Sequence, residues 1–411
     1  MAEKTKQHYV PRLYLKNFAE GKVFNIYNSK NHSIMNDVPF ASQCYKNNFY
    51  GKDKIYENEL SVLETKWSSA IKNVILNSNS IIKEDGKMLK QFCCFQYFRT
   101  KKAFLHTRNS FFDMARQMFP ILLQFKGMKA TEQEINSYAY KYSRNMESIE
   151  DTTKRQIDMA KAYYEKFDNL QILILENKTD LEFITSDNPI IIGNEFQNDC
   201  GLGVDCIGIY FLFPISPQIY ICVFDSRIYS NIKDKNKIVI SRNIVEKLNI
   251  LQYQNSLENI FSITNNGVEF IINYVDKRCN AIRKSLVSKY NNTQNNFLSQ
   301  NQKEFTNTLF ANVLSNISNK TISLICKGKP KNIRLEFLKI NKAAEPFQNK
   351  LNYNFHRSAT EKEVNDRISF MLSCNDPISK MPFKRNMQET QKEYDLVKQW
   401  GIFLKSYFNL S

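Results

Sequence analysis

The feature that most constrains the fold is a change of hydrophobic period at residue 169. Before it, apolar residues recur every three or four positions, which is the spacing of amphipathic helices. After it, runs of large or β-branched apolar residues are separated by turn residues, which is typical of strands. The pattern predicts an α+β fold, with a helical N-terminal half packed on a mainly antiparallel sheet.

Three stretches make up the predicted helical half. Residues 85–119 are apolar on several faces, so we expect one long central helix that ends before Pro120. Residues 131–168 are charged and predict either two antiparallel helices or one long helix. Residues 53–76 predict an amphipathic helix, because their apolar positions share one face: Leu60, Leu63, Trp67, Ile71 and Ile75.

Three stretches predict β-hairpins. Residues 22–35 alternate in polarity around the turn sequence NSKNH. Residues 169–192 contain apolar runs on both sides of NKTD, and residues 208–224 contain two more around PISP. Helical spacing returns at 241–261. Helices are therefore expected both before and after the sheet strands along the chain.

The polar stretch 291–302 is the best candidate for a domain boundary, because it has almost no apolar anchors. It divides a core at 1–290, helical to about residue 168 and sheet-containing over 169–290, from a C-terminal extension at 291–411. The extension is expected to be α/β, with strands at 321–328 and 332–340 and a final helix at 387–408.

The chain carries 57 Lys and Arg against 41 Asp and Glu, a formal net charge of +16. An excess of this size favours a polyanionic partner such as nucleic acid, through phosphate contacts and counterion release. The charge is diffuse, with the densest basic stretch at 327–334. Lysines on solvated faces explain the same excess, so charge alone leaves both interpretations open.

Nine cysteines are scattered through apolar contexts, and none forms a CxxC pair. This spacing favours buried free thiols in a reducing cytoplasm over disulfides or a zinc site. No apolar stretch has the length of a signal peptide or a membrane span. We therefore expect a soluble cytoplasmic protein with no membrane partner, and richness in Asn, Lys and Ile is typical of a bacterial genome of low GC content.

Two polar residues stand in apolar surroundings in the first hundred residues. His8 opens the sequence QHYVPRLYL, where a packed and hydrogen-bonded histidine is the simplest interpretation. Arg99 lies in QYFRT, inside the apolar stretch. A buried unpaired charge costs several kcal/mol, about 3 to 5 in proteins, so Arg99 must meet a carboxylate, a group of carbonyls or a bound anion.

A third polar group, Ser186, Asp187 and Asn188, ends the predicted strand in FITSDNPIII. Asp-Asn-Pro after a strand is also an ordinary turn sequence, because Asx side chains bond to nearby backbone amides. The same three residues therefore fit a turn as well as a site.

Taken in order, these stretches resemble the bacterial family called domain of unknown function 4238. The resemblance covers about residues 5–265 and implies a shared pattern without implying a reaction. The opening motif is matched by Gln7, His8, Tyr9, Val10, Pro11, Leu15, Asn17, Phe18 and Ala19. Later motifs are resembled by Glu57, Leu60, Ser61, Glu64, Gln96, Arg99, Thr100, Phe183 to Pro189, Phe213 to Pro217, Leu248 and Asn249.

The polar residues of the pattern suit one active site formed between the opening motif, the helices and the strand-end turn. His8 would act as a general base, with Asp187 and Glu64 orienting it or holding a divalent cation such as Mg²⁺ or Mn²⁺. The predicted substrate-binding residues are Arg99, which would hold a phosphate, together with Arg12, Asn188, Ser186 and Gln7. This hypothesis makes the chain a metal-dependent nuclease, an effector in antiphage defence or a toxin.

A histidine followed by a hairpin is also similar to the ββα-metal nucleases, but Gln7 stands where an acidic residue is usual there. The alternative of a different class is a basic scaffold, without catalysis, that binds nucleic acid or a protein partner in a defence complex. A domain that acts on protein or sugar is a third hypothesis. An open cleft with unfilled hydrogen-bond capacity would favour the enzyme, whereas a closed polar network would favour the scaffold.

Overall fold

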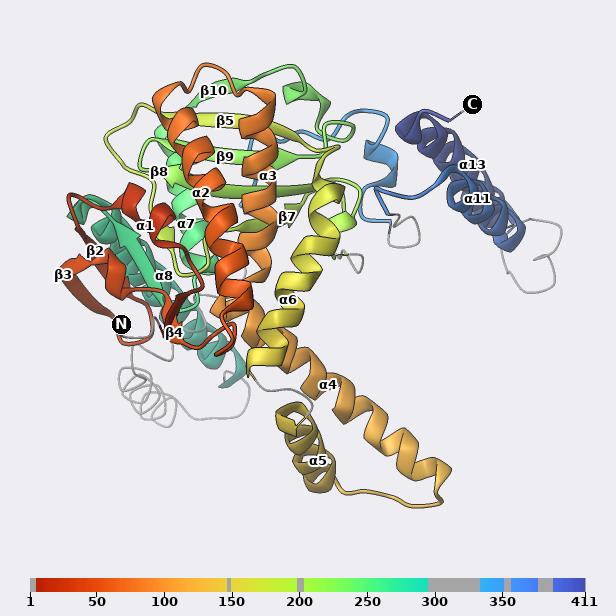
Figure 1. Cartoon of the computed structure of the whole chain (residues 1–411). Helices are drawn as coiled ribbons and strands as arrows, with labels where there is room; N and C mark the ends of the chain where they lie inside the picture. Colours follow the sequence, from red (N-terminus) through yellow and green to blue (C-terminus); the bar gives the residue numbers. More distant parts are fainter. Residues whose placement is uncertain are drawn as a thin grey trace.

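The computed structural model describes residues 5–145, 149–197, 203–294, 333–350, 356–375 and 387–410, and it confirms the α+β fold. Helices α2 and α3 lie across a five-stranded sheet, and a smaller four-stranded sheet stands beside it (Figure 1). A projecting arm, formed by α4 and α5, points away from both sheets (Figure 1).

The five-stranded sheet has the order β10-β5-β9-β8-β7 and is mainly antiparallel, as predicted, with only β10 and β5 parallel. The hairpin expected at 208–224 is confirmed, because β8 and β9 pair around the PISP turn. The strands are β5 (Gln171–Asn177), β7 (Ile191–Asn194), β8 (Ile209–Ser216), β9 (Ile219–Phe224) and β10 (Lys237–Ile240).

The hairpin expected at 169–192 is wrong. The neighbours of β5 are β9 and β10, while the chain after NKTD leaves this sheet and enters the other one as β6 (Thr185–Ser186). The turn itself forms, since Asn177 Nδ2 donates to the carbonyl of Leu181 at 2.6 Å. A local turn therefore exists, but β5 pairs with β9 and not with the residues that follow the turn.

The four-stranded sheet has the order β3-β2-β11-β6. Its β2–β3 pair is the hairpin predicted at 22–35. A separate two-stranded sheet joins β1 to β4 and places His8 opposite Tyr45. The additional strands are β1 (Lys6–His8), β2 (Val23–Asn28), β3 (Ser33–Pro39), β4 (Tyr45–Asn47) and β11 (Asn259–Ser262).

The single central helix expected at 85–119 is wrong, because the chain breaks at Arg99 and Thr100. The Thr100 hydroxyl accepts a hydrogen bond from the Ala103 amide at 3.1 Å and so begins a second helix. That helix continues past Pro120. Proline has no backbone N–H, so the helix lacks one i→i−4 hydrogen bond at this position. The helices are α1 (Arg12–Leu15), α2 (Ile55–Leu76), α3 (Lys83–Phe98), α4 (Lys101–Phe125), α5 (Glu132–Asn145), α6 (Ile149–Tyr163), α7 (Arg242–Asn255), α8 (Asn265–Gln294), α11 (Glu361–Asn375) and α13 (Met387–Phe408).

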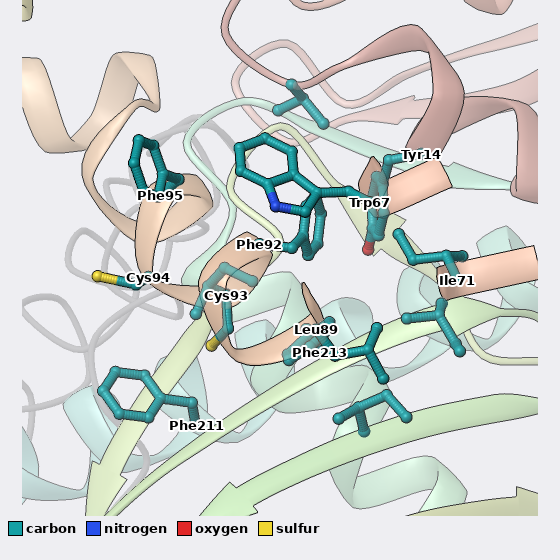
Figure 2. Close-up of a cluster of buried hydrophobic side chains, with 14 of the residues drawn as sticks. Tyr14, Trp67, Ile71, Leu89, Phe92, Cys93, Cys94, Phe95, Phe211 and Phe213 are labelled. Carbon is teal, nitrogen blue, oxygen red and sulfur yellow. The ribbon is translucent and has the colours of Figure 1, made fainter. Parts of the chain in front are cut away.

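The core lies on both faces of the five-stranded sheet, because alternate residues of β8 and β9 point to opposite sides. On one face Phe213 packs against Phe92 of α3, which meets Trp67 of α2 (Figure 2). On the other face Leu212 and Cys222 pack with α7 and with residues of the C-terminal extension. The sheet is therefore a buried middle layer.

The described part of the C-terminal extension shares this second core. Trp400 of α13 packs on Phe347 with ring centroids 4.9 Å apart, and the Tyr407 hydroxyl donates to Asp225 Oδ2 at 2.7 Å. The final helix is thus confirmed, but residues 333–340 form no strand, and the strand expected at 321–328 lies outside the described residues. Residues 333–340 bond instead to the loop after β9, for example through Asn231 Nδ2 to the carbonyl of Phe337 at 2.9 Å.

No described helix combines the length and the apolar character that a membrane span requires. Six of the nine cysteines are free and buried, as predicted: Cys44, Cys93, Cys94, Cys206, Cys222 and Cys279. Burial raises the pKa of the Cys93, Cys94 and Cys222 thiols, which keeps them protonated and unreactive.

Candidate functional site

Arg99 lies at the C-terminal end of α3 and is only 1% exposed. Its Nη2 donates to the carbonyl of His8 and to Glu64 Oε1, each at 2.8 Å, and its Nε donates to the Tyr50 hydroxyl at 3.2 Å. Burial alone would lower the pKa of Arg99, but Tyr50 and Glu64 raise it above its usual value. The guanidinium is therefore a permanent charge whose partners belong to the protein, although Nη1 has none among the described residues.

The His8 side chain is bonded to a neighbouring loop. Its Nε2 lies 3.2 Å from the carbonyl of Ala41, and because a carbonyl only accepts, this nitrogen carries the hydrogen. Burial, with smaller contributions from Arg12, Arg99 and Lys6, lowers the pKa of His8 to about 4. The imidazole is consequently neutral at physiological pH.

Gln7 and Tyr14 fasten the opening motif to the rest of the fold. Gln7 Nε2 donates to the carbonyl of Gly51 at 2.9 Å, and its Oε1 accepts from the Tyr50 amide at 2.5 Å. The hydroxyl of Tyr14, which points into the core in Figure 2, donates to the carbonyl of Pro214 at 2.7 Å. Both residues are fully buried.

Asp187 is 3% exposed and receives three backbone hydrogen bonds. Its Oδ1 accepts from the amide of Leu257 at 2.7 Å, and its Oδ2 accepts from those of Glu258 and Asn259 at 2.8 and 3.0 Å. These bonds hold the turn between α7 and β11 against β6. The arrangement is that of a carboxylate that caps a turn.

Ser186 and Asn188 belong to the strand-end turn and bond it to the start of α4 and to α7. Asn188 Oδ1 accepts from the Thr100 hydroxyl at 2.7 Å, and the Ser186 hydroxyl accepts from Gln252 Nε2 at 2.6 Å. Asn255 Nδ2 donates to the carbonyl of Asn188 at 2.7 Å. Gln252 and Asn255 are on α7, so the turn is held by both α4 and α7.

The predicted site residues therefore fall into two adjoining groups. Arg99 and Glu64 gather with the opening motif, Asp187 gathers with the strand-end turn, and Thr100 connects them because it directly follows Arg99. Most of their polar atoms bond to one another or to backbone. Within the described ranges, no three His, Cys, Asp or Glu side chains stand close enough together to hold a metal ion.

Sequence reasoning did not select Tyr50, Thr100, Gln252 or Asn255 as site residues. A usable signal existed for the last two, since they are amides three positions apart within the predicted helical stretch 241–261, on a face that also carries buried Leu248. Tyr50 had no such signal, because a tyrosine in a loop carries no periodic pattern.

Arg12 is the one predicted residue that stays exposed. It lines a hollow of about 430 Å³ on the surface of the opening motif. The other lining residues are Leu13, Lys16, Lys22, Pro39, Phe40 and Ala41.

The central sheet is buried between helical layers, and a polar network bonds the N-terminal motif to the rest of the fold. These features define the class as an α+β protein in which most polar atoms of the motif residues bond within the chain. Comparison with known families then identifies it further. The chain belongs to the family described as protein of unknown function (DUF4238), whose model matches residues 6–266. No curated protein and no solved structure was found to be similar.

Proposed function

We propose that this chain is a nucleic-acid-binding protein of the bacterial cytoplasm that acts without catalysis. It would contact phosphates through its N-terminal basic surface, which we define as Lys6, Arg12, Lys16, Lys22 and Lys46. The observation that carries the proposal is the lack of ion pairs on this surface. None of these five cations pairs with a carboxylate of the described residues.

The surrounding segment supports the same partner. Residues 5–52 contain seven Lys and Arg against two acidic residues, Glu20 and Asp37. The positive field extends to α4, since burial together with Lys101 and Arg108 lowers the pKa of Lys46. Unpaired cations on one surface raise the local concentration of a polyanion and release counterions when it binds.

The polar network is the reason that we favour binding over catalysis. Arg99, Glu64 and Asp187 have their charges engaged inside the protein, and His8 donates its ring hydrogen to a backbone carbonyl. The nuclease hypothesis stays a prediction, with neutral His8 as its base. The cytoplasmic location rests on the buried free thiols.

The test is the salt dependence of binding to labelled single-stranded DNA and RNA. For single strands, each phosphate contact contributes about 0.7 to the slope of log K against log salt concentration. Replacing Lys6, Lys16, Lys22 and Lys46 by Ala should therefore reduce the slope by about 3. A matched control replaces four exposed lysines elsewhere, Lys66, Lys72, Lys126 and Lys342, and equal effects of the two variants would contradict the proposal.

The same samples test the nuclease hypothesis. Wild type is incubated with DNA and RNA in Mg²⁺, in Mn²⁺ and in EDTA, beside His8→Ala and Asp187→Ala. Cleavage by wild type that EDTA and His8→Ala abolish, at unchanged melting temperature, would overturn the non-catalytic proposal. Intact substrate in every lane, with both variants melting lower, is the result we expect.

An exposed apolar stripe on α4 supports a second candidate function, self-association. In Figure 1 this helix projects from the body, and Phe125 near its end is 85% exposed. A stripe on one helix is self-complementary across a two-fold axis, so a second copy of this chain is the partner that we propose. The stripe consists of Met114, Met118, Ile121, Leu122 and Phe125, which share a face by their spacing.

Sedimentation velocity tests the stripe. Wild type should sediment as a dimer, and the Leu122→Glu and Phe125→Glu double variant as a monomer. Lys129→Glu is the matched control, because it changes the charge of the projecting arm by the same two units at a polar position. A wild type that stays monomeric at every concentration would contradict this second candidate.

A further inference from the structure

The hollow beside the opening motif combines three cations with an apolar wall. Arg12, Lys16 and Lys22 line it, no acidic residue does, and Leu13, Pro39, Phe40 and Ala41 supply the remaining lining. A ligand that suits such a lining carries negative charge next to a flat apolar body. A nucleotide unit of a single strand has both parts, a phosphate and an aromatic base.

We infer that this hollow is a base-binding subsite for single-stranded nucleic acid, in which a base contacts Phe40 and the adjoining phosphates contact Arg12, Lys16 and Lys22. The inference deepens the proposed function and rests on it. Aromatic side chains bind the bases of single strands because every base presents a π-face, whereas the bases of a duplex are already stacked on one another.

A second cavity, on another part of the surface, gives a useful contrast. It has a volume of about 730 Å³ and lies at the start of α3, where five lysines line it. Three carboxylates, those of Glu84, Asp168 and Asp234, line it as well. Its charges are mixed and no aromatic ring lines it, so this cavity lacks the combination of unopposed cations and an aromatic side chain that the hollow provides.

The opening motif builds the hollow, and this gives His8 a positioning role. Arg12 and Lys16 come from the motif itself, and Arg12 directly follows Pro11. The opposite wall is held by two bonds: the Phe40 amide donates to the carbonyl of Lys22 at 3.2 Å, and His8 Nε2 donates to the carbonyl of Ala41 at 3.2 Å. His8 thereby fixes the wall that carries the ring without contacting the ligand.

The main test compares Phe40→Leu with Phe40→Trp in binding to labelled single strands and to a duplex of the same sequence. Loss of one base–aromatic contact costs about 1 to 3 kcal/mol, so Phe40→Leu should weaken single-strand binding by at least about 5-fold. The salt slope should stay unchanged, since no charge is lost. Phe40→Trp should bind as well as wild type, and the duplex should not distinguish the three proteins.

A second measurement applies even if Phe40→Leu folds poorly. The chain has two tryptophans, Trp67 and Trp400, both fully buried, so a third in the hollow reports on the surface. Single-stranded DNA should quench the added emission of Phe40→Trp, whereas inorganic polyphosphate, which has charge but no base, should not. Quenching by both would mean that the hollow takes phosphate only and would overturn the inference.

Failure of this inference is distinguishable from failure of the proposed function. If wild type binds single strands with a salt slope that depends on Lys6 and Lys46, but Phe40→Leu binds equally well and Phe40→Trp is not quenched, the subsite is wrong and the function stands. If wild type binds neither single strand nor duplex, both are wrong.

Discussion

Arg99 and Glu64 form an ion pair of 2.8 Å between Nη2 and Oε1, in which the arginine side chain is 1% exposed and the glutamate side chain 26%. The guanidinium cannot lose its proton to relieve a missing partner. The stability of the α3 end therefore depends on Glu64 more than an ordinary surface ion pair would suggest.

Replacing Glu64 with Gln should lower the free energy of unfolding by about 1.5 to 3 kcal/mol, the usual contribution of a hydrogen bond to a charged group. Chemical denaturation of wild type and variant measures this difference in the free energy of unfolding. Glu59→Gln is the control, because Glu59 pairs with Lys161 at 2.6 Å and both side chains are about half exposed. An exposed pair contributes about 0 to 1 kcal/mol, so equal losses in the two variants would refute the argument.

Asp187→Asn should cost at least about 2 kcal/mol, because the new amide group would face a backbone N–H where an oxygen now accepts. Asp180→Asn is the control, with a side chain that is 79% exposed and an ion pair to Arg242. Thermal and urea unfolding give both values. An Asp187→Asn protein that melts like wild type but loses an activity would make Asp187 a catalytic residue instead.

His8 should make stability depend on pH. Its pKa falls from 6.5 to about 4 on folding, mainly through burial, so the unfolded state binds more protons between these values. The contribution of neutral, buried His8 to the free energy of unfolding is fully present above pH 6.5 and is lost as the pH falls toward 4. His8→Gln should flatten the slope of unfolding free energy over this window, and NMR titration of the ring should give the low pKa directly; a ring that titrates near 6.5 would contradict the prediction.

The Thr100 hydroxyl makes two hydrogen bonds, and comparing Thr100→Val with Thr100→Ser separates their contribution to stability from that of side-chain packing. Its hydroxyl accepts from the Ala103 amide and donates to Asn188, so Thr100→Val should lose about 1 to 2 kcal/mol for the cap alone. Thr100→Ser keeps the hydroxyl and should stay near wild type. Similar stabilities of the two variants, by denaturant titration, would show that the hydroxyl contributes little.

Much of the fold was predictable from local patterns. The hairpins at 22–35 and 208–224 form as expected, because alternation and turn residues act between neighbouring segments. The hairpin at 169–192 and the strand at 332–340 were wrong for the opposite reason. An apolar run is compatible with several partners, and the choice among them is made by segments far away in sequence.

The sequence by itself determined the fold class, the buried free thiols, the excess of positive charge and membership of a family. Only the tertiary structure decided what the motif residues contact: Arg99 with His8 and Glu64, Thr100 with Asn188, and Asp187 with the turn after α7. Periodicity predicts which face of an element is buried, but a hydrogen bond depends on where a distant backbone lies to within a few tenths of an ångström. That position is set by the packing of the helices on the sheet, which no short stretch of the chain encodes alone.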